Sequence, residues 1–159
     1  GLMRGGIGMM YSMNNIKVRL SRDMMPTSSY TDADATQNIN TLALVYTSGN
    51  LTVGGEYNMR ENSGNTVDNT STAMSVYGTM KMNDYAFFAR YDDASSENAE
   101  GERWDIANEG TLMIFGVERK MSDAVKASIN VQNWTDATLE GEEEAEAQST
   151  LYLNLEYKF

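Results

Sequence analysis

The sequence predicts an all-β fold in which about nine antiparallel strands follow one another in an up-and-down sheet. Three observations lead to this prediction. Apolar and polar residues alternate with a period of two in segment after segment, as in strands that present one apolar and one polar face. Short turns and long polar loops alternate between these segments. The chain also has 13 Gly and a single Pro, a composition that suits strands better than capped helices.

The expected strands in the first half of the chain differ in how regularly they alternate. Residues 16–21, 51–61 and 74–82 alternate cleanly, whereas the segments near 2–12 and 39–48 are less regular. Their apolar faces carry, in chain order, Ile7 and Met9, then Ile16, Val18 and Leu20, then Leu42 and Leu44, then Leu51, Val53 and Tyr57, and then Met74, Val76 and Met80. Polar or charged residues occupy most of the positions between them.

The expected strands in the second half complete the sheet. Residues 85–93, 124–134 and 151–159 alternate cleanly, and the segment near 111–121 does so less clearly. Their apolar faces carry Tyr85, Phe87 and Tyr91, then Met113, Phe115 and Val117, then Val125, Ile129 and Val131, and finally Leu151, Leu153, Leu155, Tyr157 and Phe159. An acidic, soluble-looking chain thus ends on its most hydrophobic stripe.

The connections between the strands alternate in length. Short turns are expected at 13–15, 49–50, 83–84 and 122–123, and long polar loops near 24–38, 62–71, 93–110 and 135–149. An antiparallel sheet connected in this way has tight turns at one end and long loops at the other. This asymmetry, with strands of about ten residues, is typical of outer-membrane β-barrels.

The direction of the apolar face separates two interpretations. In a water-soluble barrel or sandwich the apolar face would point inward, and alternation alone is equally compatible with that arrangement. Aromatic residues on the apolar phase favour a membrane, because most lie near strand ends, where an interfacial girdle forms: Tyr11, Tyr57, Tyr85, Tyr91, Tyr157 and Phe159. Long charged side chains also stand at strand centres on the polar phase, where a soluble barrel would have a packed core. We therefore predict an antiparallel up-and-down transmembrane β-barrel.

Composition excludes several functional classes. The net charge of −11 argues against a nucleic-acid partner, which would require clustered Lys and Arg. The chain has no His, so Ser-His-Asp and Cys-His mechanisms are impossible, and it has no Cys for disulfides or thiolate metal sites. We therefore expect no enzymatic activity and no resident cofactor.

The polar phase forms a wall on which basic residues outnumber acidic ones. The basic members are Arg4, Lys17, Arg19, Arg60, Lys81, Arg90, Lys120, Lys126 and Lys158, and the acidic members are Asp23, Glu56, Asp92, Glu118 and Glu156. The residues expected to line a pore are Arg19, Glu56, Arg60, Lys81, Arg90, Glu118 and Lys126. Because the whole chain is acidic, the surplus of carboxylates must lie in the loops.

Two of the loops carry most of this acidic surplus. The carboxylates are Glu97, Glu100, Glu102, Asp105 and Glu109 in one segment, and Glu140, Glu142, Glu143, Glu144 and Glu146 in the other. Oxygen ligands of this kind can loosely bind divalent cations that bridge lipopolysaccharide phosphates. The alternative, which we favour for any single carboxylate, is a solvated loop tip.

The last strand, LYLNLEYKF, resembles the C-terminal signature of Gram-negative outer-membrane proteins, which the barrel-assembly machinery reads. The resemblance implies that Leu155, Tyr157 and Phe159 act as an assembly signal. The segment TLMIFGVERKMSDAVKASINVQNW is similar to the penultimate hairpin of general and phosphate-selective porins. Together the resemblances imply a porin of the outer membrane that contacts lipid and lipopolysaccharide and assembles as a homotrimer.

The strand count bears on domain organisation. If Phe159 is periplasmic, about nine strands place Gly1 outside, whereas bacterial single-chain barrels have an even strand number. We therefore expect residues 1–159 to be a single β-barrel domain that forms the C-terminal portion of a larger porin barrel. The competing interpretation is a complete barrel of about eight or ten strands.

Two functional classes follow. The first is a porin, a water-filled diffusion channel for small solutes, with a preference for anions that the basic wall predicts. The second is a small structural or adhesive barrel with a plugged interior and functional acidic loops. A plugged interior requires paired charges, so the basic excess favours the porin.

Overall fold

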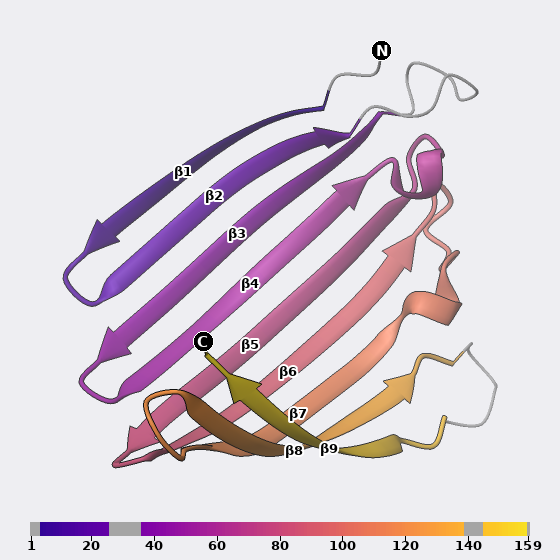
Figure 1. Ribbon diagram of the computed structural model, residues 1–159. Coiled ribbons are helices and arrows are strands. Elements are labelled where there is room, and N and C mark those ends of the chain that lie inside the picture. The colour runs from indigo at the N-terminus through magenta and orange to yellow at the C-terminus, as the bar shows by residue number, and fades with distance from the viewer. Residues whose placement is uncertain (1–3, 26–35, 139–144, 159) are drawn as a thin grey trace.

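The computed structural model describes residues 4–25, 36–138 and 145–158, and it consists of one sheet of nine antiparallel strands in the order β1 to β9. Each strand pairs with its neighbours in sequence (Figure 1). The strands are β1 (Gly5–Met13), β2 (Ile16–Met25), β3 (Gln37–Ser48), β4 (Leu51–Glu61), β5 (Thr70–Met82), β6 (Tyr85–Glu97), β7 (Gly110–Lys120), β8 (Val125–Asp136) and β9 (Gln148–Tyr157). The predicted all-β, up-and-down architecture is therefore confirmed.

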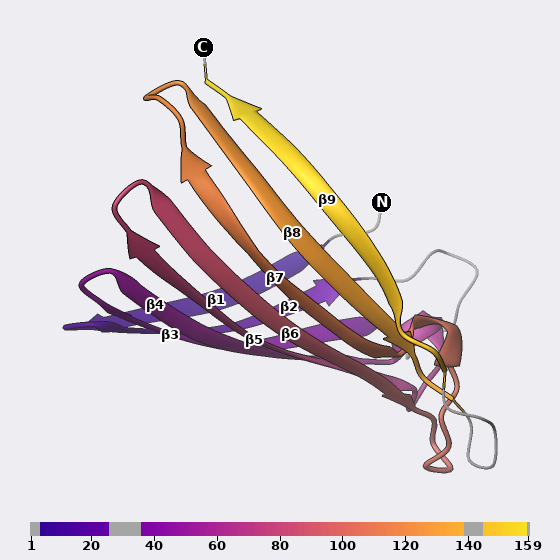
Figure 2. The same cartoon turned by 90° about the horizontal axis from the view of Figure 1, so that it is seen from below.

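The sheet curls into an open trough rather than a closed barrel. Figure 2 shows the curvature, with β1 and β9 forming the two edges of the trough. Within the described residues, neither edge strand has a partner on its outer side. A right-handed twist between neighbouring strands produces this kind of curling. The structure is thus a partial β-barrel wall.

Tight turns gather at one end of the trough and loops at the other (Figure 1). The turns require left-handed backbone conformations, which Asn and Gly adopt at the lowest cost. Asn14, Gly49 and Asn83 have φ values of 49°, 58° and 54°. The last turn is closed differently, because the Ser122 hydroxyl accepts hydrogen bonds from the backbone N–H groups of residues 124 and 125, at 3.2 and 3.1 Å. The predicted turn positions are therefore correct.

Two short 3-10 turns lie among the loops, η2 (Ser63–Asn65) and η3 (Ile106–Asn108). Both belong to the loop end of the sheet. Across residues 4–25, 36–138 and 145–158, no helix has the length and apolarity needed to cross a membrane.

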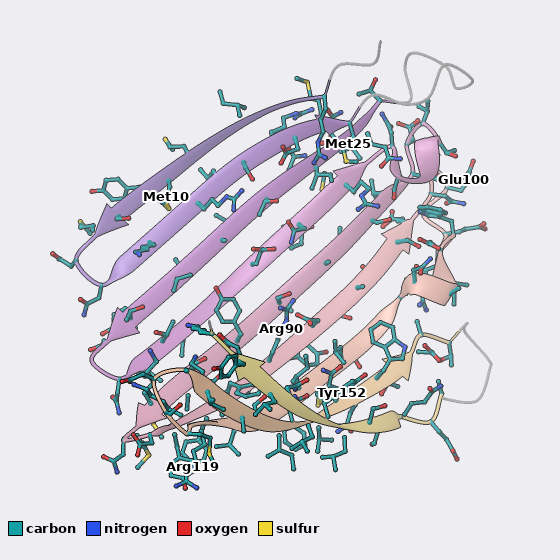
Figure 3. All side chains as sticks on the ribbon, in the orientation of Figure 1. Met10, Met25, Arg90, Glu100, Arg119 and Tyr152 are labelled. Atoms are coloured by element: carbon teal, nitrogen blue, oxygen red, sulfur yellow. The ribbon has the colours of Figure 1, made fainter. Side chains whose placement is uncertain are left out.

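The strand register sorts the side chains onto two faces. Leu20 pairs with Leu42, Leu42 with Tyr57 and Tyr57 with Met74, so the apolar phases of successive strands share one face. Figure 3 places Arg90, from the polar phase, inside the trough, and Arg119, from the other phase, outside it. The polar phase therefore lines the concave face and the apolar phase covers the convex face.

This arrangement decides between the soluble and membrane interpretations. A water-soluble barrel would bury the apolar phase on the concave side, whereas here it lies on the convex side. Leu153 and Ile7 on that face are 82% and 79% exposed. An uncovered apolar convex face with a polar interior is the arrangement of a transmembrane barrel.

The apolar belt has the height of a membrane. On β4 the convex face is apolar from Leu51 to Met59, about 27 Å along the strand at about 3.4 Å per residue. At a tilt of about 40° this span projects to roughly 21 Å, close to the band of about 25 Å in outer-membrane barrels. Tyr85 and Tyr157 border the belt near the turns, and Tyr91 borders it toward the loops. The belt therefore carries aromatic residues at both margins.

Several strands extend beyond the predicted limits. β5 begins at Thr70 rather than at 74, and β6 ends at Glu97 rather than at 93. These extensions are rich in Ser and Thr, and the hydroxyls of Thr72 and Ser95 lie 2.7 Å apart across the two strands. Apolar alternation stops there because both faces lie above the apolar belt, while the backbone pairing continues.

Candidate functional site

The residues predicted to line a pore all lie on the concave polar face. They are distributed over β2 (Arg19), β4 (Glu56 and Arg60), β5 (Lys81), β6 (Arg90), β7 (Glu118) and β8 (Lys126). Residues that pair across neighbouring strands form rows perpendicular to the strands. One such row runs from β2 to β6 and consists of Arg19, Ala43, Glu56, Ser75 and Asp92. The structure therefore places the predicted residues on one continuous surface.

Part of this charge is neutralised within the wall. The Arg90 Nε donates to both carboxylate oxygens of Asp92, each at 2.8 Å. The Arg90 Nη2 also donates to the Ser75 hydroxyl at 3.3 Å. Nearer the turns, Lys126 forms an ion pair with Glu118 at 3.0 Å. Each of these two ion pairs is neutral as a whole, so the net charge of the concave face comes from the remaining groups.

Other wall cations have no anionic partner among the described residues. Within the described part of the chain, Lys17, Arg19, Arg60 and Lys81 make no ion pair. These residues run from the turn end, at Lys17 and Lys81, to the loop end, at Arg60. Asp23 and Glu56 of the wall also make no ion pair within the described ranges, so the basic surplus that remains on the concave face is smaller than the number of free cations.

Two aromatic side chains of the concave face pack against glycines of the neighbouring strand. A Cβ atom at Gly54 would lie 2.5 Å from Cζ of Tyr77, and one at Gly116 would lie 2.7 Å from Cζ of Phe88. Because such contacts are impossible, only glycine allows these rings to rest on the neighbouring strand. The rings therefore occupy little of the space inside the trough.

The loop between β6 and β7 is anchored by a buried carboxylate. Glu109 is only 2% exposed. Its carboxylate accepts hydrogen bonds from the Ser96 hydroxyl and from the Arg103 Nε, the latter at 2.5 Å. The Ser96 oxygen in turn accepts the backbone N–H groups of Trp104 and Asp105, at 3.2 and 2.9 Å. A satisfied, buried charge pair of this kind holds the loop in one conformation.

Trp104 and Arg103 join this loop to its neighbours. The Trp104 indole N–H donates to the Thr70 carbonyl at 3.0 Å, and its ring packs on Gly64, where a Cβ would lie 3.0 Å from the ring. The Arg103 Nη1 donates to the carbonyl of Thr138 at 2.7 Å. Three loops are thus tied together at one end of the trough.

These anchoring contacts correct one sequence-based expectation. Glu109 was expected to belong to a solvated acidic loop or to a cation site, but it is buried and paired with Arg103. Arg103 and Trp104 stand next to each other in an otherwise acidic loop, and this pair is the signal from which an ordered loop could have been expected.

The anchored loop and the strand wall enclose a cavity of about 610 Å³ at the loop end of the concave face. The strands contribute Asn58 and Arg60 to its lining, and the loop contributes Asp105, Asn108 and Glu109. This cavity was not predicted, because Arg60 and Asp105 are distant in sequence.

The predicted cation sites are tested only in part. Among residues 4–25, 36–138 and 145–158, no cluster of three or more Asp, Glu, His or Cys could hold a metal ion. Glu140, Glu142, Glu143 and Glu144 lie outside the described residues.

The convex face carries charged groups that the alternation of the sequence does not reveal. Above the apolar belt, Arg22 forms an ion pair with Glu61 at 3.3 Å, and the Asn40 amide donates to Glu61 at 3.1 Å. At the turn end, the Arg119 guanidinium lies 5.4 Å from the centre of the Tyr85 ring. Both sites lie at the margins of the belt, where the polar headgroups of a bilayer would be.

Asp123, in the turn between β7 and β8, has a shifted pKa. The Lys120 ammonium donates a hydrogen bond of 2.5 Å to the Asp123 carboxylate. This hydrogen bond, together with the positive charge of Lys120, lowers the pKa of Asp123 below its ordinary value.

The structure describes two of the three residues of the predicted assembly signal. Leu155 and Tyr157 lie on the convex face of β9, where Leu155 pairs with Ala127 and Tyr157 with Val125. Phe159 lies outside the described residues.

Comparisons with known proteins agree with this architecture. A search of curated proteins found no match. Among solved structures, the chain is similar to OmpT, an in-vitro folded outer-membrane protein of Vibrio cholerae in its trimer form, with a TM-score of 0.62 and 18% identity. The match covers 94% of this chain and 52% of OmpT, so the chain spans about half the length of that protein.

The family comparison extends over almost the whole sequence. The family model for Gram-negative porins matches residues 4–159. That range includes every strand of the sheet, the charged concave face and the loop that Glu109 anchors. The chain therefore belongs to the Gram-negative porin family and is a protein of the outer membrane.

Proposed function

We propose that this chain forms a large part of the wall of a water-filled channel through which small solutes diffuse across the outer membrane. The observation that carries the proposal is the concave face, which bears ionised side chains from Lys81 near the turns, through Arg19, to Arg60 near the loops. Unpaired charges along a barrel interior need water around them, because desolvating each of them would cost on the order of several kcal/mol. A water-filled lumen supplies that solvation.

The proposal includes further strands that close the barrel. β1 and β9 run in the same direction, since each runs from the loop end to the turn end (Figure 1). A barrel closed entirely by antiparallel pairs therefore needs an odd number of additional strands between these edges. The greater length of OmpT is consistent with a larger barrel of this kind. We therefore propose that residues 1–159 form part of one larger barrel domain.

We also propose the partners of the assembled barrel. The trimer form of OmpT supports a homotrimer. The convex belt suits contact with lipid, and the charged groups above it, Arg22 and Glu61, suit the polar region of lipopolysaccharide. We propose that Leu155, Tyr157 and Phe159 are read by the barrel-assembly machinery. Deletion of Phe159 should then lower the amount of inserted barrel more than the stability of barrel already folded, and normal surface levels would contradict this role.

The channel should prefer anions. Lys17, Arg19, Arg60 and Lys81 remain without ion pairs in the described residues, and they stand on the pore wall itself. Charges on the wall act on a passing ion within a few ångströms, whereas loop carboxylates are screened over a Debye length of about 8 Å at physiological ionic strength. Rings of Arg and Lys select anions in this way.

The alternative is a structural or adhesive barrel with a plugged interior. A plug would have to pair or bury the free cations of the wall, and the described residues supply no such plug to Arg19 or Lys81. Neither proposal requires catalysis or a cofactor.

Electrical recording of the intact barrel in a planar lipid bilayer tests the proposed function. We expect stepwise increases in conductance on insertion and, across a salt gradient, a reversal potential on the anion-selective side. A folded, inserted barrel that conducts no current would refute the channel. A reversal potential with clear cation preference would refute the anion selectivity alone.

A further inference from the structure

We propose that the cavity at the loop end of the concave face is a binding site for small zwitterionic solutes, such as short peptides with free termini, on their way into the pore. This inference rests on the proposed function and adds the class of solute. The cavity has a volume of about 610 Å³, which is within the range of sites that hold small molecules. The strands form one of its sides, and the loop between β6 and β7 forms the other.

The strand side offers one free positive charge. Arg60 lines the cavity from β4, and its side chain makes no ion pair within the described part of the chain. Its guanidinium can donate two parallel hydrogen bonds to a carboxylate, which a Lys could not match in geometry. The strand side therefore suits the carboxylate end of a solute.

The loop side offers one free negative charge. Asp105 is half-buried and lines the same cavity. One of its carboxylate oxygens accepts a hydrogen bond from the Asn108 amide at 2.7 Å, and no described cation forms an ion pair with it. The remaining acceptor capacity suits the ammonium end of the same solute.

The other charged group of the cavity, Glu109, and the Asn58 amide are already occupied. The Glu109 carboxylate is held by Arg103 and Ser96. The Asn58 amide donates to Glu56 at 2.7 Å, and its carbonyl oxygen accepts from the Thr41 hydroxyl, also at 2.7 Å. A solute that enters the cavity therefore meets one unpaired cation and one unpaired anion from opposite sides.

The loop is held ready for binding. Ser96 fixes the backbone N–H of Asp105 at 2.9 Å, and the Trp104 indole fixes the adjacent residue to the Thr70 carbonyl at 3.0 Å. Binding then requires little ordering of the loop, which lowers its entropic cost. A solute with one charge alone would gain one contact and leave the opposite charge without a partner, so the site discriminates in favour of zwitterions.

The test measures equilibrium binding to the intact folded barrel in detergent with three dipeptide probes. Glycylglycine is zwitterionic, N-acetylglycylglycine keeps only the carboxylate, and glycylglycinamide keeps only the ammonium. We expect glycylglycine to bind about fivefold more tightly than either single-charge probe, the effect of one exposed charge contact of about 1 kcal/mol. Equal binding of the three probes would overturn the proposal.

Variants assign each end of the solute to one residue. Arg60→Gln should lower glycylglycine affinity to that of glycylglycinamide, and Asp105→Asn should lower it to that of N-acetylglycylglycine. Lys81→Gln is the matched control, because it removes a free wall cation at the turn end, outside the cavity. If Lys81→Gln weakened binding as much as Arg60→Gln does, a general field of the wall would explain the binding and the specific site would be refuted.

A charge swap guards against variants that merely disturb folding. The double variant Arg60→Asp with Asp105→Arg keeps both charges in the cavity and exchanges their positions. It should bind glycylglycine within about twofold of the wild type, since the dipeptide can enter in the reverse orientation. A folded swap variant with no preference for the zwitterion would contradict the proposal.

The proposed binding site and the proposed channel can each be refuted without the other. A barrel that conducts ions but does not prefer the zwitterion would refute the site and leave the channel intact. A barrel that binds glycylglycine with the expected dependence on Arg60 and Asp105, yet carries no current, would refute the channel and leave the site intact.

Discussion

Leu153 and Asn154 provide a direct test of which face of the sheet meets the membrane. They are neighbours on β9, and the register puts Leu153 opposite Ile129 on the convex face and Asn154 opposite Ser128 on the concave face. Leu153→Arg would place a guanidinium in the apolar belt, whereas Asn154→Arg would place the same group in the lumen. The pair compares one side chain at two adjacent positions of one strand.

The depth of Leu153 sets the expected magnitude. It stands four residues from Tyr157, or about 14 Å along the strand at about 3.4 Å per residue. At a tilt of about 40° this becomes roughly 10 Å above the tyrosine margin, near the middle of a belt of about 25 Å. An Arg at the midplane of a barrel destabilises it by about 2–4 kcal/mol. That range lowers the folding equilibrium constant by about 30- to 1,000-fold.

The assay is reversible unfolding of the intact barrel in lipid vesicles by a denaturant, followed by tryptophan fluorescence. Leu153→Arg should lose about 2–4 kcal/mol, and Asn154→Arg less than about 1 kcal/mol, as expected for lumen positions. A nitroxide at each position gives a second measurement, with Leu153 accessible to oxygen and Asn154 accessible to water-soluble relaxants. Equal destabilisation by the two variants, or a larger loss for Asn154→Arg, would refute the assignment of the convex face to lipid.

Three further predictions concern the wall and the loops. Arg19→Gln and Arg90→Gln should each lower the anion-to-cation permeability ratio, measured as a reversal potential at low salt, because each removes one positive charge from the wall and Arg90→Gln also leaves the Asp92 carboxylate without its cation. An unchanged ratio in both variants would contradict control by the wall charges. Gly116→Val should destabilise the barrel by about 1–3 kcal/mol, because the added side chain would overlap with atoms of the neighbouring strands. Gly55→Ala is the control, because its added carbon meets only ordinary contacts, and it should change the free energy of unfolding by less than about 1 kcal/mol in the same assay. Arg103→Met leaves the buried Glu109 carboxylate without its cation, at a cost of about 3–5 kcal/mol. The loop between β6 and β7 should therefore open and be cut by protease while the strands stay intact. Unchanged protection from protease would show that the ion pair does not hold the loop.

The faces of the strands could be predicted from the sequence because they depend only on period-two alternation. Ile16, Val18 and Leu20 are separated by Lys17 and Arg19, and no long-range contact is needed to assign these residues to opposite faces. The short turns were predictable for a similar reason, since residues suited to left-handed conformations recur at the turn positions.

The organisation of the loops could not be predicted, because it depends on contacts between segments that are distant in sequence. Arg103 reaches the carbonyl of Thr138, and Trp104 reaches that of Thr70. Each of these residues lies in a polar segment without periodicity, so only the folded sheet brings them together. The strand extensions were missed for a different reason: beyond the apolar belt, Ser and Thr pair their backbones without any alternation of hydrophobicity.

The pairing of charges on the wall could not be predicted from the sequence either. Arg90 and Asp92 were correctly placed on one face, but whether they form an ion pair depends on side-chain conformation and on the Ser75 hydroxyl across the strand. The sequence therefore indicated which residues share the concave face, but not which of them form ion pairs there.

The height of the anchored loop above the apolar belt has an electrical consequence. The cavity is lined by Arg60 and by Ser71 and Ser96 of the hydroxyl-rich strand ends, at the loop-side margin of the apolar belt. Transmembrane voltage does work only on charge that moves through the insulating layer, about 2.3 kcal/mol per unit charge for each 100 mV crossed in full. A charge held at the rim has traversed little of that layer. Occupancy of the rim should therefore follow solute concentration on the loop side and remain nearly constant as the membrane is polarised.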